Sequence, residues 1–129
     1  HMYRKIGEEF IADDFAHEQS VVFETGKGLV IFNSCSHGGI VNIVREVQMA
    51  LGGQKVYAVV GGFHMMKLSG MDTLAIPEEE VVETAQELKG LGVEEIYTGH
   101  CTGNIAFGIL KKELGEMVHA LGTGETVVF

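Results

Sequence analysis

Three stretches of this chain end an apolar run in a turn that carries a histidine within two residues of a glycine. They are LVIFNSCSHGG at 29–39, VYAVVGGFH at 56–64 and EEIYTGHCTG at 94–103. Apolar runs that stop at glycine-rich turns are typical of buried parallel strands. In open α/β sheets, ligands bind outside the carboxyl ends of the strands. The repeated pattern therefore predicts a largely parallel sheet with a functional site at one edge.

The residues around the first of these turns predict a hairpin followed by a βαβ unit. A β-branched and aromatic run at 20–25 precedes a short glycine turn and the apolar strand 29–33, which favours a hairpin. Apolar residues then recur at helical spacing over 40–51, and Gly52-Gly53 end this predicted helix. The apolar run 55–60 predicts a strand parallel to 29–33, joined through a right-handed crossover.

The second half of the chain continues the alternation of helix and strand. The loop at 61–76 is long enough to favour a functional role. Pro77 begins a predicted helix with three glutamates in its first turn, and a strand at 94–98 and a helix at 105–117 follow. A last short strand is predicted at 126–129. This order predicts an α/β fold with a mixed sheet and helices on one face.

Composition limits the classes of partner. Eighteen acidic residues against nine Lys and Arg give a net charge of −9, which argues against nucleic acid and against an anionic membrane surface. No apolar run approaches the roughly twenty residues needed to cross a bilayer. Two cysteines do not make a disulfide framework, so a reducing cytoplasm is the expected location. His1-Met2 is expected to be a remnant of an expression vector, which leaves residues 3–129 as one domain.

Cysteine and histidine at the first and third turns are candidate metal ligands. Both residue types are soft ligands that suit zinc or iron. Cys35 and His37 can equally form a capping or core pair at the start of a helix. Adjacent side chains of an extended segment point to opposite sides, so His100 is predicted to be the ligand and Cys101 to be packed or to support it.

The remaining candidates each admit two interpretations. His64 lies among apolar residues, so it can occupy an apolar pocket, or it can contact substrate and shuttle a proton beside the metal. Asp14 is a candidate carboxylate ligand, although turn formation explains Asp13-Asp14 equally well. His17 and His119 have no supporting context and are predicted to lie on the surface.

The glycine-flanked turn at 36–40 also admits an anion, because free N–H groups and the helix dipole converge there. It matches neither the Walker sequence nor GxGxxG. A second class of function therefore stays open, namely a non-catalytic α/β module that binds a phosphate or nucleotide, or a structural partner subunit. Thr102 and Asn104 are expected to cap the helix that follows the third turn.

Taken together, these motifs resemble one branch of the metallo-β-lactamase-fold superfamily. The resemblance extends from about Asp13 to Phe129. It rests on four stretches: GLVIFNSCSHGGIVNIV, VVGGFH, GHCTGNIAFGILKKELG and LGTGETVVF. The preceding segment, DDFAHEQSVVF, is similar to the acidic segment of the branch, where Glu18-Gln19 match. Members of this branch are described as dihydropterin-linked ribofuranosylaminobenzene phosphate synthases. The resemblance is to the C-terminal half of their αββα sandwich.

The resemblance implies site residues and a cofactor. His37 and His100 correspond to metal ligands, with Cys35 and Asp14 as further candidates, and His64 corresponds to an active-site loop element. The implied cofactor is zinc or another divalent ion such as iron or manganese. The implied activity is that of a metal-dependent hydrolase or synthase acting on a small molecule that can carry a phosphate.

The main ligand motif of the superfamily, HxHxDH, does not occur in this chain. Three explanations are open: a chain cut at an internal boundary, one subunit of a split enzyme, or a half that associates with itself. An unpaired half would expose an apolar sheet face, which soluble monomers rarely tolerate. We therefore expect a homodimer or a missing partner half, and no catalysis by this chain alone.

Overall fold

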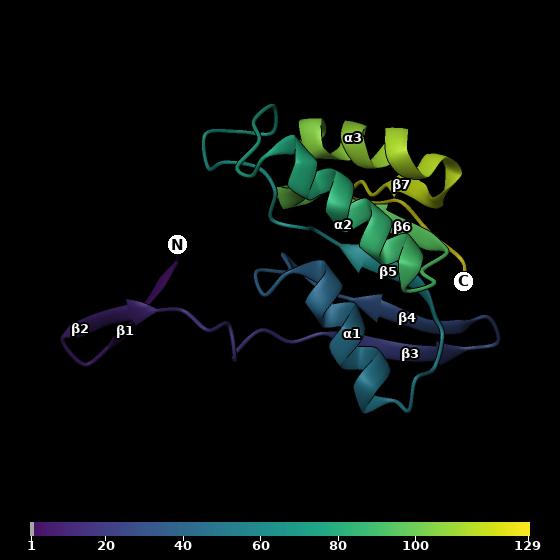
Figure 1. Ribbon diagram of the computed structural model, residues 1–129, viewed down its shortest axis with the longest axis horizontal. Helices are drawn as coiled ribbons and strands as arrows, with labels where there is room; N and C mark the ends of the chain where they lie inside the picture. The colour runs from purple at the N-terminus through teal and green to yellow at the C-terminus, as the bar shows by residue number, and fades with distance from the viewer. Residues whose placement is uncertain (1) are drawn as a thin grey trace.

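A five-stranded mixed sheet forms the body of the computed structural model, which describes residues 2–129 (Figure 1). In spatial order the strands are β3 (Val21–Thr25), β4 (Gly28–Phe32), β5 (Val56–Gly61), β6 (Glu95–Thr98) and β7 (Val118–Ala120). β3 and β4 form an antiparallel hairpin, and the other neighbours pair in parallel. The predicted hairpin and the predicted parallel strands are confirmed.

Three helices cover one face of this sheet (Figure 1). They are α1 (Ile40–Ala50), α2 (Glu78–Gly90) and α3 (Asn104–Leu114), accompanied by the short 3₁₀ turns η1 (His100–Thr102) and η2 (Gly115–Met117). One side chain from each helix, Val44, Leu88 and Leu110, is fully buried against the sheet. Each such side chain contributes about 1.5–3 kcal/mol by leaving water. The expectation of helices on one face of a mixed sheet is confirmed.

The opposite face of the sheet has a thinner cover. Val30, Ala58 and Val60 are buried there, beneath aromatic side chains and the end of the chain. The Phe129 ring packs edge-on against Phe32 and Tyr97, with centroids 6.0 and 5.5 Å away. Toward the β3 edge this cover stops, and Val21 and Phe23 remain 55% and 57% exposed.

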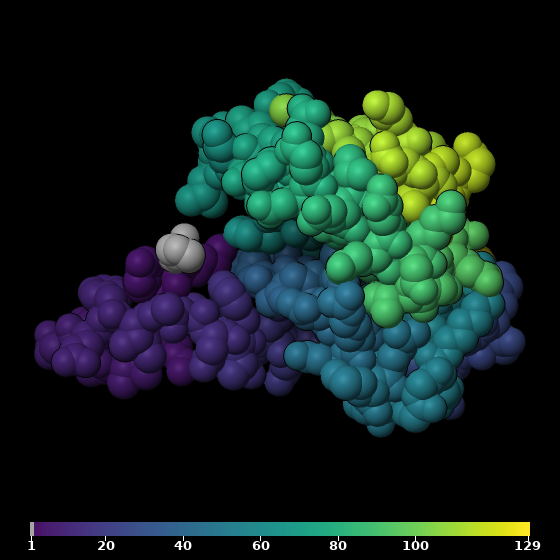
Figure 2. Space-filling view, in the orientation of Figure 1, coloured from purple at the N-terminus to yellow at the C-terminus, as the bar shows by residue number. Residues whose placement is uncertain are grey.

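A second hairpin, β1 (Tyr3–Ile6) with β2 (Glu9–Ala12), extends from the body as an arm (Figures 1 and 2). Tyr3, Ile6 and Phe10 are each more than half exposed. An isolated two-stranded hairpin is only marginally stable in water, so this arm is expected to gain from another surface. His1, part of the predicted vector remnant, lies outside the described residues.

One sequence prediction about the end of the chain is wrong. Residues 126–129 form no strand; the last strand is β7, and Phe129 packs on the sheet through its ring. His119, predicted to lie on the surface, is partly exposed in β7, where its Nε2 is 2.6 Å from Glu95 Oε2. Among residues 2–129, no helix is long and apolar enough to cross a membrane.

Candidate metal centre

The three histidine-bearing turns meet at the carboxyl ends of β4, β5 and β6. The Gly62 N–H donates to Ser34 O at 2.7 Å, which joins the turn after β5 to the turn after β4. The Phe63 N–H donates to Thr102 Oγ1 at 2.9 Å, and the Met65 N–H donates to Cys101 O at 2.9 Å, which joins it to the turn after β6. The parallel register of these strands brings the turns together, as the sequence pattern predicted.

His37 and His64 lie face to edge in this site. Their ring centroids are 4.3 Å apart, and the Phe15 ring is 5.6 Å from His37 on another side. Burial lowers the pKa of His64, the charge of a protonated His37 lowers it further, and Glu18 partly opposes this. His64 therefore favours the neutral imidazole, the form that binds a metal or accepts a proton.

A second group of donors lies next to this pair. One ligand atom each from Cys35, His100 and Cys101 lies within 4.8 Å of the others. The expectation that His100 and Cys101 point to opposite sides is wrong, because these residues form the η1 turn rather than extended backbone. His100 has a φ of 50°, which lets both side chains approach Cys35.

The Cys101 thiol is held by its surroundings. Its residue is 5% exposed, and burial raises its pKa to about 11, although the His64 N–H bond opposes this. That N–H donates to Cys101 Sγ at 3.2 Å, and the thiol donates to Cys35 O at 3.7 Å. Gly62 leaves the space for the sulfur, because a Cβ there would lie 2.5 Å from Cys101 Sγ.

Backbone strain is concentrated at the same place. Within residues 2–129, positive φ angles outside glycine occur at Phe15, Ser36, His64 and His100, with values of 50–55°. All four lie in or beside the turns described above. Such conformations cost on the order of 1–3 kcal/mol each and persist where the surrounding structure imposes them, most often at functional sites.

Glu18 occupies the turn that was considered for a phosphate. Its two carboxylate oxygens accept the N–H groups of His37 and Gly38 at 2.8 and 2.9 Å. This carboxylate, nineteen residues before His37 in sequence, provides the negative charge that the start of α1 favours. The geometry therefore gives no support to the alternative of a phosphate- or nucleotide-binding module at this turn.

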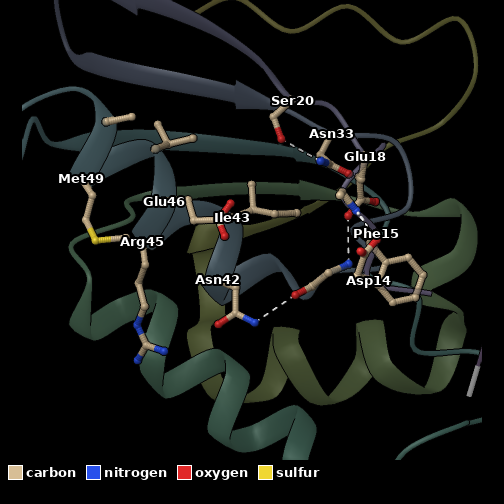
Figure 3. Close-up of a pocket in the computed structure, with 14 residues that line it drawn as sticks. Asp14, Phe15, Glu18, Ser20, Asn33, Asn42, Ile43, Arg45, Glu46 and Met49 are labelled. Carbon is tan, nitrogen blue, oxygen red and sulfur yellow. Dashed lines mark hydrogen bonds between the residues drawn. The ribbon is translucent and has the colours of Figure 1, made fainter. Parts of the chain in front are cut away.

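Two hollows border the site. The larger, of about 620 Å³, runs from Glu18 and Gly38 along α1 past Asn42 and Arg45, and neither cysteine lines it (Figure 3). The smaller, of about 320 Å³, lies between the arm and His64 and is lined by Met2, Ala12, Asp13, Phe15 and His64. The smaller hollow is lined by the His64 imidazole, whereas no histidine among residues 2–129 lines the larger one. Of the two, the smaller hollow therefore gives a small molecule access to a group that can exchange a proton.

Comparisons with known proteins agree with this arrangement. No protein-family model matches the chain. A crystal structure of a metal-dependent hydrolase of the β-lactamase superfamily superimposes with a TM-score of 0.85 and 30% identity, over 98% of this chain and 46% of that one. This chain has the fold of half a metallo-β-lactamase domain.

A curated relative supports the same half-domain. The chain is 36% identical over 128 residues to 7,8-dihydropterin-6-methyl-4-(beta-D-ribofuranosyl)-aminobenzene-5'-phosphate synthase of Methanocaldococcus jannaschii. The alignment covers 99% of this chain and 41% of the relative. The chain thus spans less than half the length of both proteins, and the resemblance inferred from the motifs is confirmed.

Some residues predicted to act in the site or as caps bind other groups instead. Asp14 is engaged by Arg4, whose Nη1 and Nη2 donate to its two oxygens at 2.8 and 2.9 Å, so its position does not support a ligand role. Thr102 does not cap α3, because its hydroxyl accepts the Phe63 N–H and bonds Thr98 Oγ1 at 2.6 Å. Asn104 begins α3 and donates to Asp72 Oδ1 at 2.6 Å instead of capping it.

Sequence reasoning missed the parts that Glu18 and Cys101 play in holding the half-domain site. The carboxylate oxygens of Glu18 bind backbone N–H groups of the His37 turn rather than a side chain of the site. The available signal was the match of Glu18-Gln19 to the acidic segment of the related branch. For Cys101 the signal was its position between His100 and a glycine turn, which permits a tight 3₁₀ turn.

Proposed function

We propose that this chain is the C-terminal, metal-binding half of a metal-dependent hydrolase or synthase of the metallo-β-lactamase fold. The observation that carries the proposal is the convergence of three histidine-bearing turns on one sheet edge, in a half-domain 30% identical to a metal-dependent hydrolase. In the assembled enzyme, His37 and His100 hold the ion, with Cys35 beside them.

The donors present fit a divalent metal. Imidazole nitrogen and thiolate sulfur suit zinc, and imidazole also suits iron; zinc is the ion proposed, with iron or manganese as alternatives. A bound ion of this kind polarises a substrate and lowers the pKa of its water. His64, kept neutral by burial and by His37, accepts a proton at its free ring nitrogen.

Several residues hold these groups in place. Glu18 fixes the His37 turn through two backbone N–H groups, and the Phe15 ring screens His37 from water. Thr102 fixes the loop that carries His64. A substrate reaches His64 through the hollow beside the arm. A small molecule that can carry a phosphate is proposed, in keeping with the name of the curated relative.

We further propose that catalysis requires the complementary half of the fold, the half that carries HxHxDH. HxHxDH is absent from the chain, and each matched protein is more than twice as long as the segment it shares with this one. The thinly covered sheet face would pack against a complementary half or against a second copy. Light scattering of the purified chain tests self-association through this face: a dimer supports it, and a strict monomer contradicts it.

Elemental analysis of the purified chain tests the metal assignment. We expect a divalent metal in the parent chain, with the metal content lowered in His37→Ala and strongly reduced in His100→Ala. His17→Ala, an exposed histidine outside the site, is the matched control and should keep the metal of the parent. Equal metal content in the parent and both site variants would contradict the assignment.

A further inference from the structure

Two thiols and an imidazole meet where the turn after β4 faces η1. Cys35 comes from the first turn and His100 and Cys101 from the second, with one ligand atom of each within 4.8 Å of the others. We propose that these three residues bind a zinc ion through two thiolates and one imidazole, entirely within this chain. This site shares His100 with the function proposed above but needs neither His37 nor a second polypeptide.

The spacing of the donors is close to what zinc requires. With zinc about 2.3 Å from sulfur and about 2.0 Å from nitrogen, tetrahedral geometry places neighbouring ligand atoms roughly 3.3–3.8 Å apart. The three donors, all within 4.8 Å of one another, therefore need to close by at most about 1–1.5 Å. Cys35 is half-buried and His100 is exposed, so their side chains are able to rotate toward the buried Cys101.

The charges of this site balance without help from a carboxylate. Binding breaks two S–H bonds, forms two zinc–sulfur bonds and releases two protons to solvent. Two thiolates and a neutral imidazole then neutralise Zn²⁺, so no net charge is left in the partly buried site. Three protein ligands leave a fourth position open, and the exposure of His100 places that position toward solvent.

The geometry around the Cys101 sulfur is that of a positioned ligand, and a bound ion would displace the proton that burial otherwise keeps on the thiol. The His64 N–H donates to its sulfur at 3.2 Å, which is the kind of bond that orients a metal ligand. Gly62 provides room that any side chain would take from the sulfur. His64 and His100 both have left-handed backbone. This conformation directs the His64 N–H to the Cys101 sulfur and brings the His100 imidazole within reach of it. A cysteine that only fills a core needs none of these features.

Cobalt(II) titration of the reduced, metal-free full chain tests the site. We expect one cobalt per chain with a thiolate-to-cobalt charge-transfer band in the near ultraviolet, removed by competing zinc. Cys35→Ser and Cys101→Ser should each lose about half of the band and weaken binding on the order of 10-fold or more. His100→Ala should keep the band but bind more weakly. Circular dichroism confirms that each variant is folded.

His37→Ala is the control that separates this inference from the proposed function. It should keep the charge-transfer band, because His37 is not a ligand of the thiolate site. Absence of the band in the parent chain, or a band of parental intensity in Cys101→Ser, would overturn the inference. Cobalt binding without a thiolate band, and lost in His37→Ala, would overturn it while leaving the proposed function standing.

Discussion

The two faces of the sheet differ in how completely this chain covers them. One face carries three helices, and its residues Leu29, Ile31 and Ile96 have no exposed surface. The other has a narrow buried strip under a few rings and the last residue, and leaves Phe23 exposed. The helix-covered face is a self-sufficient core, whereas the other face is finished only in part. In a half-domain, this is the face on which a second polypeptide is expected.

The largest effect is expected on the helix-covered face. Leu88→Ala removes a fully buried side chain of α2 and leaves a cavity, which costs about 2–5 kcal/mol of unfolding free energy. Urea denaturation followed by circular dichroism measures this loss. Leu68→Ala is the matched control, since Leu68 is 99% exposed and its change should stay within about 0.5 kcal/mol. Equal losses in the two variants would remove the contrast.

An intermediate effect is expected from the thin cover of the other face. Phe129→Ala removes edge-on contacts to Phe32 and Tyr97, each worth about 0.5–1.5 kcal/mol. We expect a loss of about 1–2 kcal/mol by denaturant titration. Val128→Ala, at a side chain 86% exposed, should leave the midpoint unchanged. A loss as large as that of a helix-face variant would mean that this face is a full core of its own.

A smaller effect on stability, with a clear effect on association, is expected at the β3 edge. Phe23→Asp places a charge on a side chain that is 57% exposed, so we expect less than about 1 kcal/mol of destabilisation. If the open face binds a second polypeptide, the charge should abolish the complex, as measured by light scattering. Leu68→Asp controls for the added charge. Association that survives Phe23→Asp would place the interface elsewhere.

The smallest effect is expected where the arm meets the turn before β3. The pKa of Asp14 lies below its ordinary value, chiefly because the Ala16 N–H donates to it and next because of the Arg4 charge. Arg4→Ala should raise this pKa only in part, which an NMR pH titration of the carboxyl carbon detects. Lys5→Ala is the control on the same strand. A return to the ordinary value would make Arg4 the main cause.

The sign of the pH dependence follows from the lowered pKa of Asp14. Its ionised form stabilises the fold above pH 3.8, the ordinary value, and this stabilisation is lost as pH falls through the lower folded value. Because the carboxyl is exposed, the effect belongs to the attachment of the arm rather than to the core.

Much of the fold was accessible from sequence because local patterns specify it. The β-branched run before Thr25, the helical spacing after Ile40 and the glutamates after Pro77 each predicted an element within a few residues of its observed bounds. The run at 126–129 misled, because all four of its residues suit strands but no strand edge binds them. The β1–β2 arm has no comparable signal in the sequence, because its apolar residues face no core.

The sequence by itself determined that three histidine turns share one sheet edge, because parallel strands align their carboxyl ends. Only the tertiary structure decided which side chains meet there. Glu18 reaches the His37 turn across nineteen residues, and Cys101 joins Cys35 because η1 is a tight turn rather than extended backbone. Such contacts depend on the backbone conformation of single residues, such as His64 and His100, and on the packing of segments that are distant in sequence. Local sequence patterns encode neither of these.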